Sequence, residues 1–179
     1  MGSVKDLIIK KSPSENLSGS GQFVFSDRYS VFDWGEMPDH IPHKGESLCL
    51  ITSKKKKKME KMGIKTHYKG LVENGEIKKL DSIKNPVNTM EVELVNVIEP
   101  EFNNGKYDYS VYDSNISNCL IPLEIIYRNT LPENSSFRSR AENGEIDIQD
   151  YGLEELPPPG IKLENPIYDV STKLEASDR

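Results

Sequence analysis

Three groups of charged and hydroxyl side chains have residue types and spacings suited to chemistry. The first is the N-terminal run Gly2-Ser3-Val4-Lys5, which precedes an apolar segment. A turn of small residues exposes backbone N–H groups, and a lysine that follows it can neutralise phosphate. Because the run matches neither the P-loop nor the G-x-G-x-x-G pattern, a surface strand with a solvated lysine is the alternative.

The second group lies within residues 26–35 and places two carboxylates, a guanidinium and a hydroxyl among aromatic residues. These polar side chains belong to Asp27, Arg28, Ser30 and Asp33. Burial of aspartate and arginine is unfavourable unless they pair with each other or bind a charged group. The group therefore predicts either a polar substrate site on an aromatic floor or a structural pair of Arg28 with Asp27 or Asp33.

The third group follows an apolar run that begins at Ile121 and ends at Arg128. Ser135, Arg138 and Arg140 come soon after it. Arginine offers a planar fork of donors for phosphate or carboxylate, and serine adds hydroxyl donors. This pattern indicates an anion site at a strand end, with a solvated basic loop as the alternative. If the three guanidinium groups form an unliganded cluster, they should repel one another, so loss of Arg128 should leave the free protein as stable or more stable.

Two further charged segments have simpler interpretations. The C-terminal run from Ser171 to Arg179 is either part of a site or a helix start with Ser171 or Thr172 as its N-cap. The run Lys54–Lys58 predicts a solvated helix face, because five like charges repel one another.

The sequence predicts no metal site. The histidines lack metal-ligand spacing, and the two cysteines have neither a partner pair nor a catalytic context. These residues are His40, His43, His67, Cys49 and Cys119.

Composition limits the classes of protein that fit. The chain has 179 residues, enough for about one domain or two small lobes. It has 23 Lys and Arg against 29 Asp and Glu, so its formal charge of −6 disfavours a nucleic-acid partner. No apolar stretch approaches the ~20 residues that span a bilayer, and no apolar signal core follows Met1. These features predict a cytoplasmic protein with reduced thiols and no membrane partner.

The elements that must position these groups are mostly strands. Apolar and β-branched runs predict strands over 1–11, 22–26, 67–72, 75–80, 90–98, 120–127 and 166–170, the run over 120–127 being a buried strand. One helix is predicted over 46–62, ended by Gly63. Residues 100–118 predict a hairpin-like excursion, and residues 131–161 are loop-rich. The fold class is therefore α+β with a mainly antiparallel sheet.

Taken in order, several segments resemble the SAICAR synthetase family. The most specific match is Ile121–Arg128, which resembles the signature I-P-[LI]-E-x-x-x-R. Others are similar to D-R-x-S-A-[FY]-D, I-P-x-K-G, G-I-x-T-H-[FY], P-I-[FY]-x-x-S-T-K-x-E and the family's N-terminal glycine-lysine segment. These matches lie at 27–33, 41–45, 63–68, 166–175 and 2–6.

Three departures from the family pattern stand out. Ser135 follows Arg128 by seven positions instead of six, and Asn134 replaces the usual glycine. Residues 100–118 are extra sequence between two strands. The family's D-x-K-[FY]-E-F-G segment, which resembles a kinase-type magnesium site, has no counterpart before Arg179. The resemblance therefore implies a C-terminally truncated chain, which is either a fragment or a member without its metal-binding half.

The resemblance implies a two-lobed fold with a kinase-like nucleotide lobe over 1–98, an inserted excursion over 99–118 and the start of a substrate-binding lobe over 119–179. It implies a ligase that uses ATP and Mg²⁺ to join L-aspartate to carboxyaminoimidazole ribotide in purine biosynthesis through an acyl phosphate. The magnesium ligands would lie in the missing C-terminal part. A homo-oligomer stays open.

The resemblance also implies site residues, none of which is assigned as catalytic or metal-binding. Those for nucleotide are Ser3, Val4 and Lys5, and those for substrate are Asp27, Arg28, Ser30, Asp33, Lys44, Arg128, Ser135, Lys173 and Asp178. Two alternatives stay open: a non-catalytic homologue that only binds nucleotide or ribotide, and an unrelated β-rich binding domain.

Overall fold

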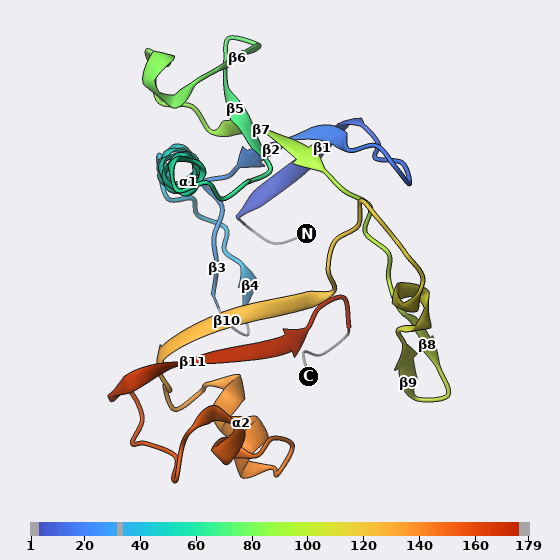
Figure 1. Cartoon of the computed structure of the whole chain (residues 1–179). Helices are drawn as coiled ribbons and strands as arrows, with labels where there is room; N and C mark the ends of the chain where they lie inside the picture. The colour runs from blue at the N-terminus through green and yellow to red at the C-terminus, as the bar shows by residue number, and fades with distance from the viewer. Residues whose placement is uncertain (1–3, 32–33, 176–179) are drawn as a thin grey trace. The chain divides into compact units, whose positions relative to one another are not determined.

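The computed structural model describes residues 4–31 and 34–175 (Figure 1). The chain divides into two compact units. The first comprises residues 1–98 and 114–120, and the second comprises residues 99–113 and 121–179. Each unit has its own hydrophobic core.

The first unit is built on a five-stranded antiparallel sheet with the strand order β1-β2-β7-β5-β6. Its strands are β1 (Lys5–Lys11), β2 (Gly19–Phe25), β5 (Tyr68–Glu73), β6 (Glu76–Lys78) and β7 (Thr89–Leu94). A tight turn joins β5 to β6, in which Asn74 and Gly75 have φ of 54° and 81°. Asn and Gly tolerate positive φ, so this dipeptide is a local sequence signal for a tight hairpin turn.

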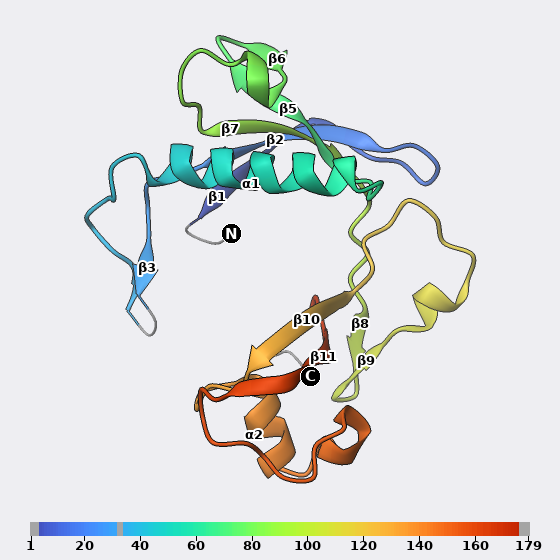
Figure 2. The same ribbon diagram turned by 60° about the vertical axis from the view of Figure 1, so that its left-hand side comes forward.

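Helix α1 (Lys44–Lys61) runs along one face of this sheet (Figure 2). Its buried residues Cys49 and Ser53 lie one turn apart, and the Ser53 hydroxyl donates to the Cys49 carbonyl at 2.8 Å. Cys49 joins Phe25, Leu71, Met90 and Val92 in the core between helix and sheet. Burial raises the pKa of the Cys49 thiol to about 12, so this cysteine is a packing residue and stays protonated.

Short elements connect the main ones in the first unit. They are β3 (Ser30–Val31), β4 (Gly35–Glu36) and a 3₁₀ turn, η1 (Leu80–Ser82). Residues 114–120 return to the sheet, where the Asn96 and Asn118 amides both donate to the Ser14 carbonyl.

The second unit is built around a long two-stranded antiparallel ribbon, β10 (Leu123–Thr130) and β11 (Lys162–Thr172). Between these strands the chain forms helix α2 (Ser136–Glu142) and the 3₁₀ turn η3 (Ile148–Tyr151). Residues 99–113 contribute the hairpin β8 (Glu101–Asn103) and β9 (Lys106–Asp108), followed by the 3₁₀ turn η2 (Ser110–Asp113).

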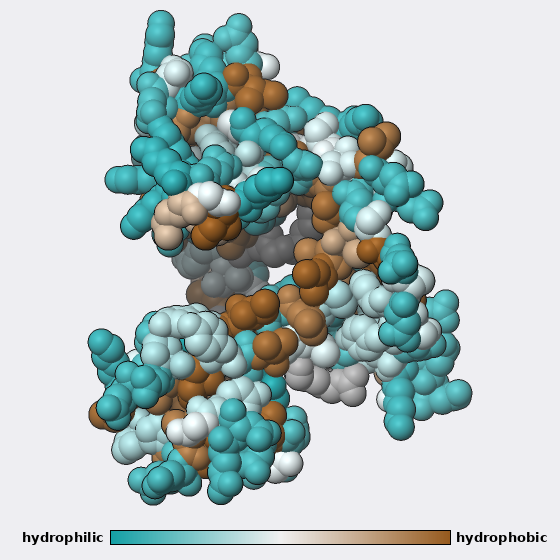
Figure 3. Space-filling model, in the orientation of Figure 1, coloured by the Kyte–Doolittle hydropathy of each residue, from teal (hydrophilic) through white to brown (hydrophobic). Residues whose placement is uncertain are grey.

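One face of the ribbon packs on α2 and the other is exposed. Leu131, Phe137, Leu163 and Ile167 form the buried core of this unit, and Phe137 meets Tyr151 edge-on at 4.9 Å. On the opposite face Ile125 is 76% exposed. The visible surface of the chain is mostly hydrophilic, with hydrophobic side chains in smaller groups (Figure 3).

The predicted α+β class with a mainly antiparallel sheet is confirmed. The predicted helix over 46–62 is α1, and Gly63 follows it with φ of 82°. The excursion contains the β8–β9 hairpin. Residues 131–161 are loop-rich as predicted, although they also hold α2, a helix too short to show an apolar repeat. Two expectations are wrong. The strand over 120–127 is not buried, because one face of β10 is exposed and the other is only partly buried. Ser171 and Thr172 end β11 instead of beginning a helix.

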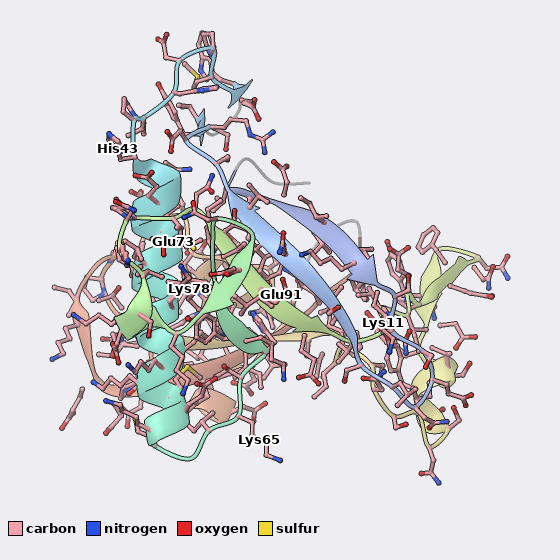
Figure 4. The ribbon with its side chains drawn as sticks, turned by 90° about the horizontal axis from the view of Figure 1, so that it is seen from above. Lys11, His43, Lys65, Glu73, Lys78 and Glu91 are labelled. Carbon is pink, nitrogen blue, oxygen red and sulfur yellow. The ribbon has the colours of Figure 1, made fainter. Side chains whose placement is uncertain are left out.

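The β5–β6 hairpin is fastened by a buried carboxylate. Glu73 accepts hydrogen bonds from Lys78 Nζ at 2.8 Å and from the backbone N–H groups of Lys84 and Asn85 at 2.9 and 2.8 Å. Figure 4 shows Glu73 and Lys78 close together. These donors, with Lys78 foremost, lower the pKa of Glu73 to about 2.

We expect Glu73→Gln to destabilise the first unit in a pH-dependent way. The folded pKa lies below the ordinary value of 4.5, so the carboxylate stabilises the fold above that pH and loses this effect as the pH falls toward 2. Urea unfolding should therefore show a gap between the two proteins at about pH 7 that shrinks by about pH 3. Glu76→Gln, at the exposed end of the same hairpin, is the control. A gap that does not change with pH would contradict this role.

Candidate functional site

Lys5 begins β1, and its ammonium lies over the aromatic rings of β2. Its Nζ is 4.1 Å from the centre of the Phe23 ring and 5.9 Å from that of Phe25. Antiparallel pairing sets this geometry, because Lys5 lies opposite Phe25 in the β1–β2 register. The ring faces attract the cation. Even so, burial, with help from Lys56, lowers the pKa of Lys5.

Two further basic side chains, Lys56 and His67, interact electrostatically with Lys5. The His67 ring meets Phe23 edge-on at 5.9 Å, and its pKa is lowered by burial first and then by Lys56 and Lys5. Lys56 comes from α1 and His67 from the segment that leads into β5. We call Lys5, Lys56 and His67 the basic cluster. Like charges that destabilise one another in the free protein are relieved when an anion binds between them.

An open cavity of about 840 Å³ adjoins the basic cluster. Its lining combines basic side chains with two carboxylates; these charged residues are Lys56, Lys65, His67, Lys69, Glu60 and Glu93. Lys65 is labelled in Figure 4 beyond the end of α1. This cavity changes the interpretation of the lysine run on α1.

The run Lys54–Lys58 does not form one uniform solvated face. Lys54, Lys55 and Lys58 are exposed, but Lys56 is half-buried at the cavity. Lys57, also half-buried, pairs with Asp81. The prediction of a solvated face therefore holds for three of the five lysines.

Asp27 caps helix α1 from a distance in sequence. Its carboxylate accepts hydrogen bonds from the backbone N–H groups of Gly45 at 2.8 Å and His43 at 3.2 Å. These bonds, that from Gly45 above all, lower the pKa of Asp27. His43, labelled at the start of α1 in Figure 4, has φ of 63°, and its Nδ1 lies 2.8 Å from Glu46 Oε2. The Asp27 carboxylate is thus engaged by the first N–H groups of the helix, which lack partners within the helix.

Arg28 and Lys44 tie the second group to its neighbours. Arg28 pairs with Asp6 at 2.7 Å and with Glu36 at 3.8 Å, so the predicted pair with Asp27 is wrong. Lys44 donates through Nζ to the carbonyls of Ser26 and Arg28. A pairing rule based on nearest neighbours missed Asp6, because β1 and the end of β2 meet only once the sheet forms.

The structure brings the first two groups together. The Ser26 N–H donates to the Val4 carbonyl at 2.9 Å, beside the Arg28–Asp6 pair. Ser30 lies in the exposed strand β3. Three predicted site residues, Ser3, Asp33 and Asp178, lie outside the described residues.

The third group is centred on a carboxylate that the sequence prediction missed. Asp169, on β11, is fully buried. Its Oδ2 accepts from Arg128 Nε at 2.8 Å and lies 2.7 Å from Arg128 NH2. Its Oδ1 accepts from Arg140 NH2 at 2.6 Å. We call Arg128, Asp169 and Arg140 the arginine–aspartate triad.

Two serine hydroxyls flank the triad where α2 begins. Arg128 donates to Ser136 Oγ at 3.0 Å and, more distantly, to Ser135 Oγ at 3.4 Å. Arg138, from the same helix, is directed elsewhere: it donates to the carbonyls of Leu131 and Pro157. Of the three predicted arginines, two therefore converge and one is structural.

Lys173, another predicted substrate residue, pairs with Glu124 across the ribbon, and its N–H donates to the Pro122 carbonyl at 2.7 Å. The register explains this pair, because Glu124 lies opposite Ser171. Lys173 thus has an acidic partner on β10.

The expectation that the arginines repel one another is wrong, since Asp169 lies between Arg128 and Arg140. A signal for Asp169 was present in the sequence. A lone acidic residue interrupts the apolar run Ile167-Tyr168-Asp169-Val170, and a carboxylate buried in a strand requires a cationic partner. The predicted site residues thus fall into two sets, one in each unit.

Two absences complete the description. Across residues 4–31 and 34–175, no group of three or more His, Cys, Asp or Glu side chains could hold a metal ion. No helix within those same residues is long and apolar enough to cross a membrane.

We expect Arg128→Ala to destabilise the free protein. Only 13% of the Arg128 side chain and none of Asp169 is exposed, so the substitution leaves a buried carboxylate with one partner fewer. Breaking a buried ion pair of this kind costs about 3 kcal/mol. Thermal and urea unfolding without ligand test this. The control is Arg28→Ala, which should lose less stability because the acidic partners of Arg28 are partly exposed. An unchanged or higher melting temperature for Arg128→Ala would refute the triad.

Comparisons with known proteins agree with the motif matches. The family model described as SAICAR synthetase matches residues 13–179. A provisionally named phosphoribosylaminoimidazole-succinocarboxamide synthase of Archaeoglobus fulgidus is 53% identical over 179 residues, which are 100% of this chain and 52% of that protein. The phosphoribosylaminoimidazole-succinocarboxamide synthase of Thermoplasma volcanium is 32% identical over 88% of this chain and 44% of its own length.

One solved structure shows a likeness in fold. The phosphoribosylaminoimidazole-succinocarboxamide synthase of Ehrlichia chaffeensis matches 99% of this chain and 51% of its own, with 20% identity and a TM-score of 0.55. A type-2 SAICAR synthetase in complex with ADP matches 97% of this chain and 49% of its own, with 20% identity and a TM-score of 0.48. The chain spans about half the length of the relatives that it matches. On the family match and the identity to its relatives, the chain belongs to the SAICAR synthetase family.

Proposed function

We propose that this chain supplies the nucleotide- and ribotide-binding half of an ATP-dependent ligase that joins L-aspartate to carboxyaminoimidazole ribotide. Membership of the family supports the reaction. The observation that carries the proposal is the placement of Arg128, the arginine of the signature segment. It lies in a mostly buried triad, beside two serine hydroxyls, where donors for an anionic substrate converge.

The basic cluster of the first unit supports ATP as the second ligand. Lys5, at the head of β1, would meet the phosphates together with the backbone at Ser3 and Val4. Lys56 adds positive charge beside Lys5, and the neutral His67 ring adds a hydrogen-bonding nitrogen. Phosphoryl transfer depends on positioning and on neutralising charge, and lysine acts there as a point charge that tolerates several phosphate positions.

The remaining predicted residues take supporting roles in this proposal. Asp27 and Lys44 hold the start of α1 against the loop that follows β2, and Arg28 fastens that loop to Asp6. Ser30, Asp33, Lys173 and Asp178 would border the substrate.

The proposed reaction explains why the protein needs cationic side chains, because its substrates are anionic. A carboxylate is a poor electrophile, so its oxygen attacks the γ-phosphorus of ATP and ADP leaves. The product is an acyl phosphate, and the aspartate amine then displaces phosphate to form the amide. The protein's part is to align these charged groups and exclude water. The described residues offer no cluster that fits Mg²⁺, so no step is assigned to it.

A second candidate function is binding of nucleotide or ribotide without turnover. The basic cluster and the arginine–aspartate triad would serve binding alone as well as they would serve turnover. Incubation with ATP, Mg²⁺, L-aspartate and carboxyaminoimidazole ribotide separates the two functions. The ligase predicts ADP and the succinocarboxamide product in equal amounts. Binding of both ligands without product identifies the second function, and binding of neither contradicts both.

We expect Lys5→Ala to weaken ATP binding more than ribotide binding. A lost charge-assisted contact is worth roughly 1.5–3 kcal/mol, or about tenfold or more in affinity. Lys56→Gln should act in the same direction. The matched control is Lys55→Gln, because Lys55 is exposed on the same helix. Calorimetric titration of each variant measures this. Equal ATP affinity for Lys5→Ala and the parent would overturn the nucleotide assignment.

A further inference from the structure

We propose that Asp169 is a positioning residue that holds Arg128 and Arg140 as a two-guanidinium clamp for a phosphate monoester. This inference rests on the proposed function and deepens it. It adds Arg140 to the groups that meet the ribotide and gives Asp169 a role through the two arginines.

The two oxygens of Asp169 are divided between the arginines. Oδ2 accepts a hydrogen bond from Arg128 Nε and also pairs with Arg128 NH2, whereas Oδ1 accepts a hydrogen bond from Arg140 NH2. A guanidinium is planar, so a contact through Nε and NH2 fixes the plane of the Arg128 group. The Arg128 donors that remain are directed to Ser135 and Ser136. The carboxylate thereby sets the orientation of the donors that it does not use itself.

The charges within the triad do not cancel. Arginine keeps its charge at any physiological pH, so one carboxylate leaves the two guanidinium groups with one net positive charge. The Arg128 and Arg140 side chains are 13% and 11% exposed, so water does little to screen that charge. A buried excess of charge is unfavourable unless an anion completes it.

The donor set suits phosphate better than carboxylate. Two guanidinium groups held by different oxygens, together with two serine hydroxyls, present donors from several directions. A phosphate monoester carries three acceptor oxygens and up to two negative charges. A carboxylate has two oxygens in one plane and fills only one fork. Ribotides carry such a phosphate on C5 of the ribose.

Preorganisation explains why a buried acid would stand in an anion site. Two long arginine side chains without a shared partner would repel each other and adopt many rotamers. Fixing those rotamers before the ligand arrives lowers the entropic cost of binding. An account based on net charge alone and the positioning account therefore predict opposite changes in anion affinity when Asp169 is replaced. Loss of Asp169 raises the net positive charge, which favours anion binding, but it releases the clamp, which weakens binding.

The test is calorimetric titration of ribose 5-phosphate into the parent, Asp169→Asn and Arg140→Gln, each below its melting temperature. We expect both variants to lose affinity by about tenfold or more. Asp169→Glu, which keeps the charge, should bind more tightly than Asp169→Asn. Equal or tighter binding by Asp169→Asn would overturn the positioning role. Unchanged binding by Arg140→Gln would remove Arg140 from the clamp.

A matched control comes from the same helix. Arg138→Gln removes an equal charge from α2, but Arg138 donates to backbone carbonyls instead of Asp169. We expect a lower melting temperature and unchanged affinity for ribose 5-phosphate. Imidazole-4-carboxylate is the second probe: if the parent binds it and not ribose 5-phosphate, the phosphate assignment fails. Turnover is measured in a separate assay. If the parent is an active ligase but Asp169→Asn binds ribose 5-phosphate as tightly as the parent does, only the clamp is contradicted.

Discussion

The buried carboxylate of Asp169 is the constraint on which the second unit depends. It joins β11 to β10 through Arg128 and to α2 through Arg140, so one side chain connects the three elements around the core. Such a group can exist inside a small core only because both oxygens have charged donors. The ion pairs that stabilise the unit also set the direction of the remaining Arg128 donors, which face the serines at the start of α2. In the proposed role of the triad, stability and ligand recognition would depend on the same atoms.

The first unit differs, because it places the basic side chains Lys5, Lys56 and His67 near one another. Aromatic rings on β2 support Lys5, while burial and neighbouring cations lower the pKa values of Lys5 and His67. Nearby acidic residues have partners within the fold: Asp27 caps α1, Asp6 holds Arg28, Glu60 accepts from Thr66, and Glu93 pairs with Lys69. In the proposed function the two units would offer two kinds of anion site, one of lysines and histidine and one of arginines and serines.

Much of the fold could be predicted because its signals are local. Strand alternation, the Asn74-Gly75 turn and Gly63 after α1 depend on a few adjacent residues. The missed features depend on contacts distant in sequence. Helix α2 is too short to show a period, the partner of Arg28 is 22 residues away in β1, and Asp169 is 41 residues from Arg128. Motif matching located Arg128 but gave no account of what holds its guanidinium.

A structure of the chain with carboxyaminoimidazole ribotide bound tests the central claim most directly. The account predicts that the ribotide phosphate lies within hydrogen-bond distance of Arg128 and Arg140, next to the serines at the start of α2, while Asp169 keeps both arginines. A phosphate bound elsewhere, or a phosphate that reaches Arg128 only after Asp169 has released it, would contradict the account.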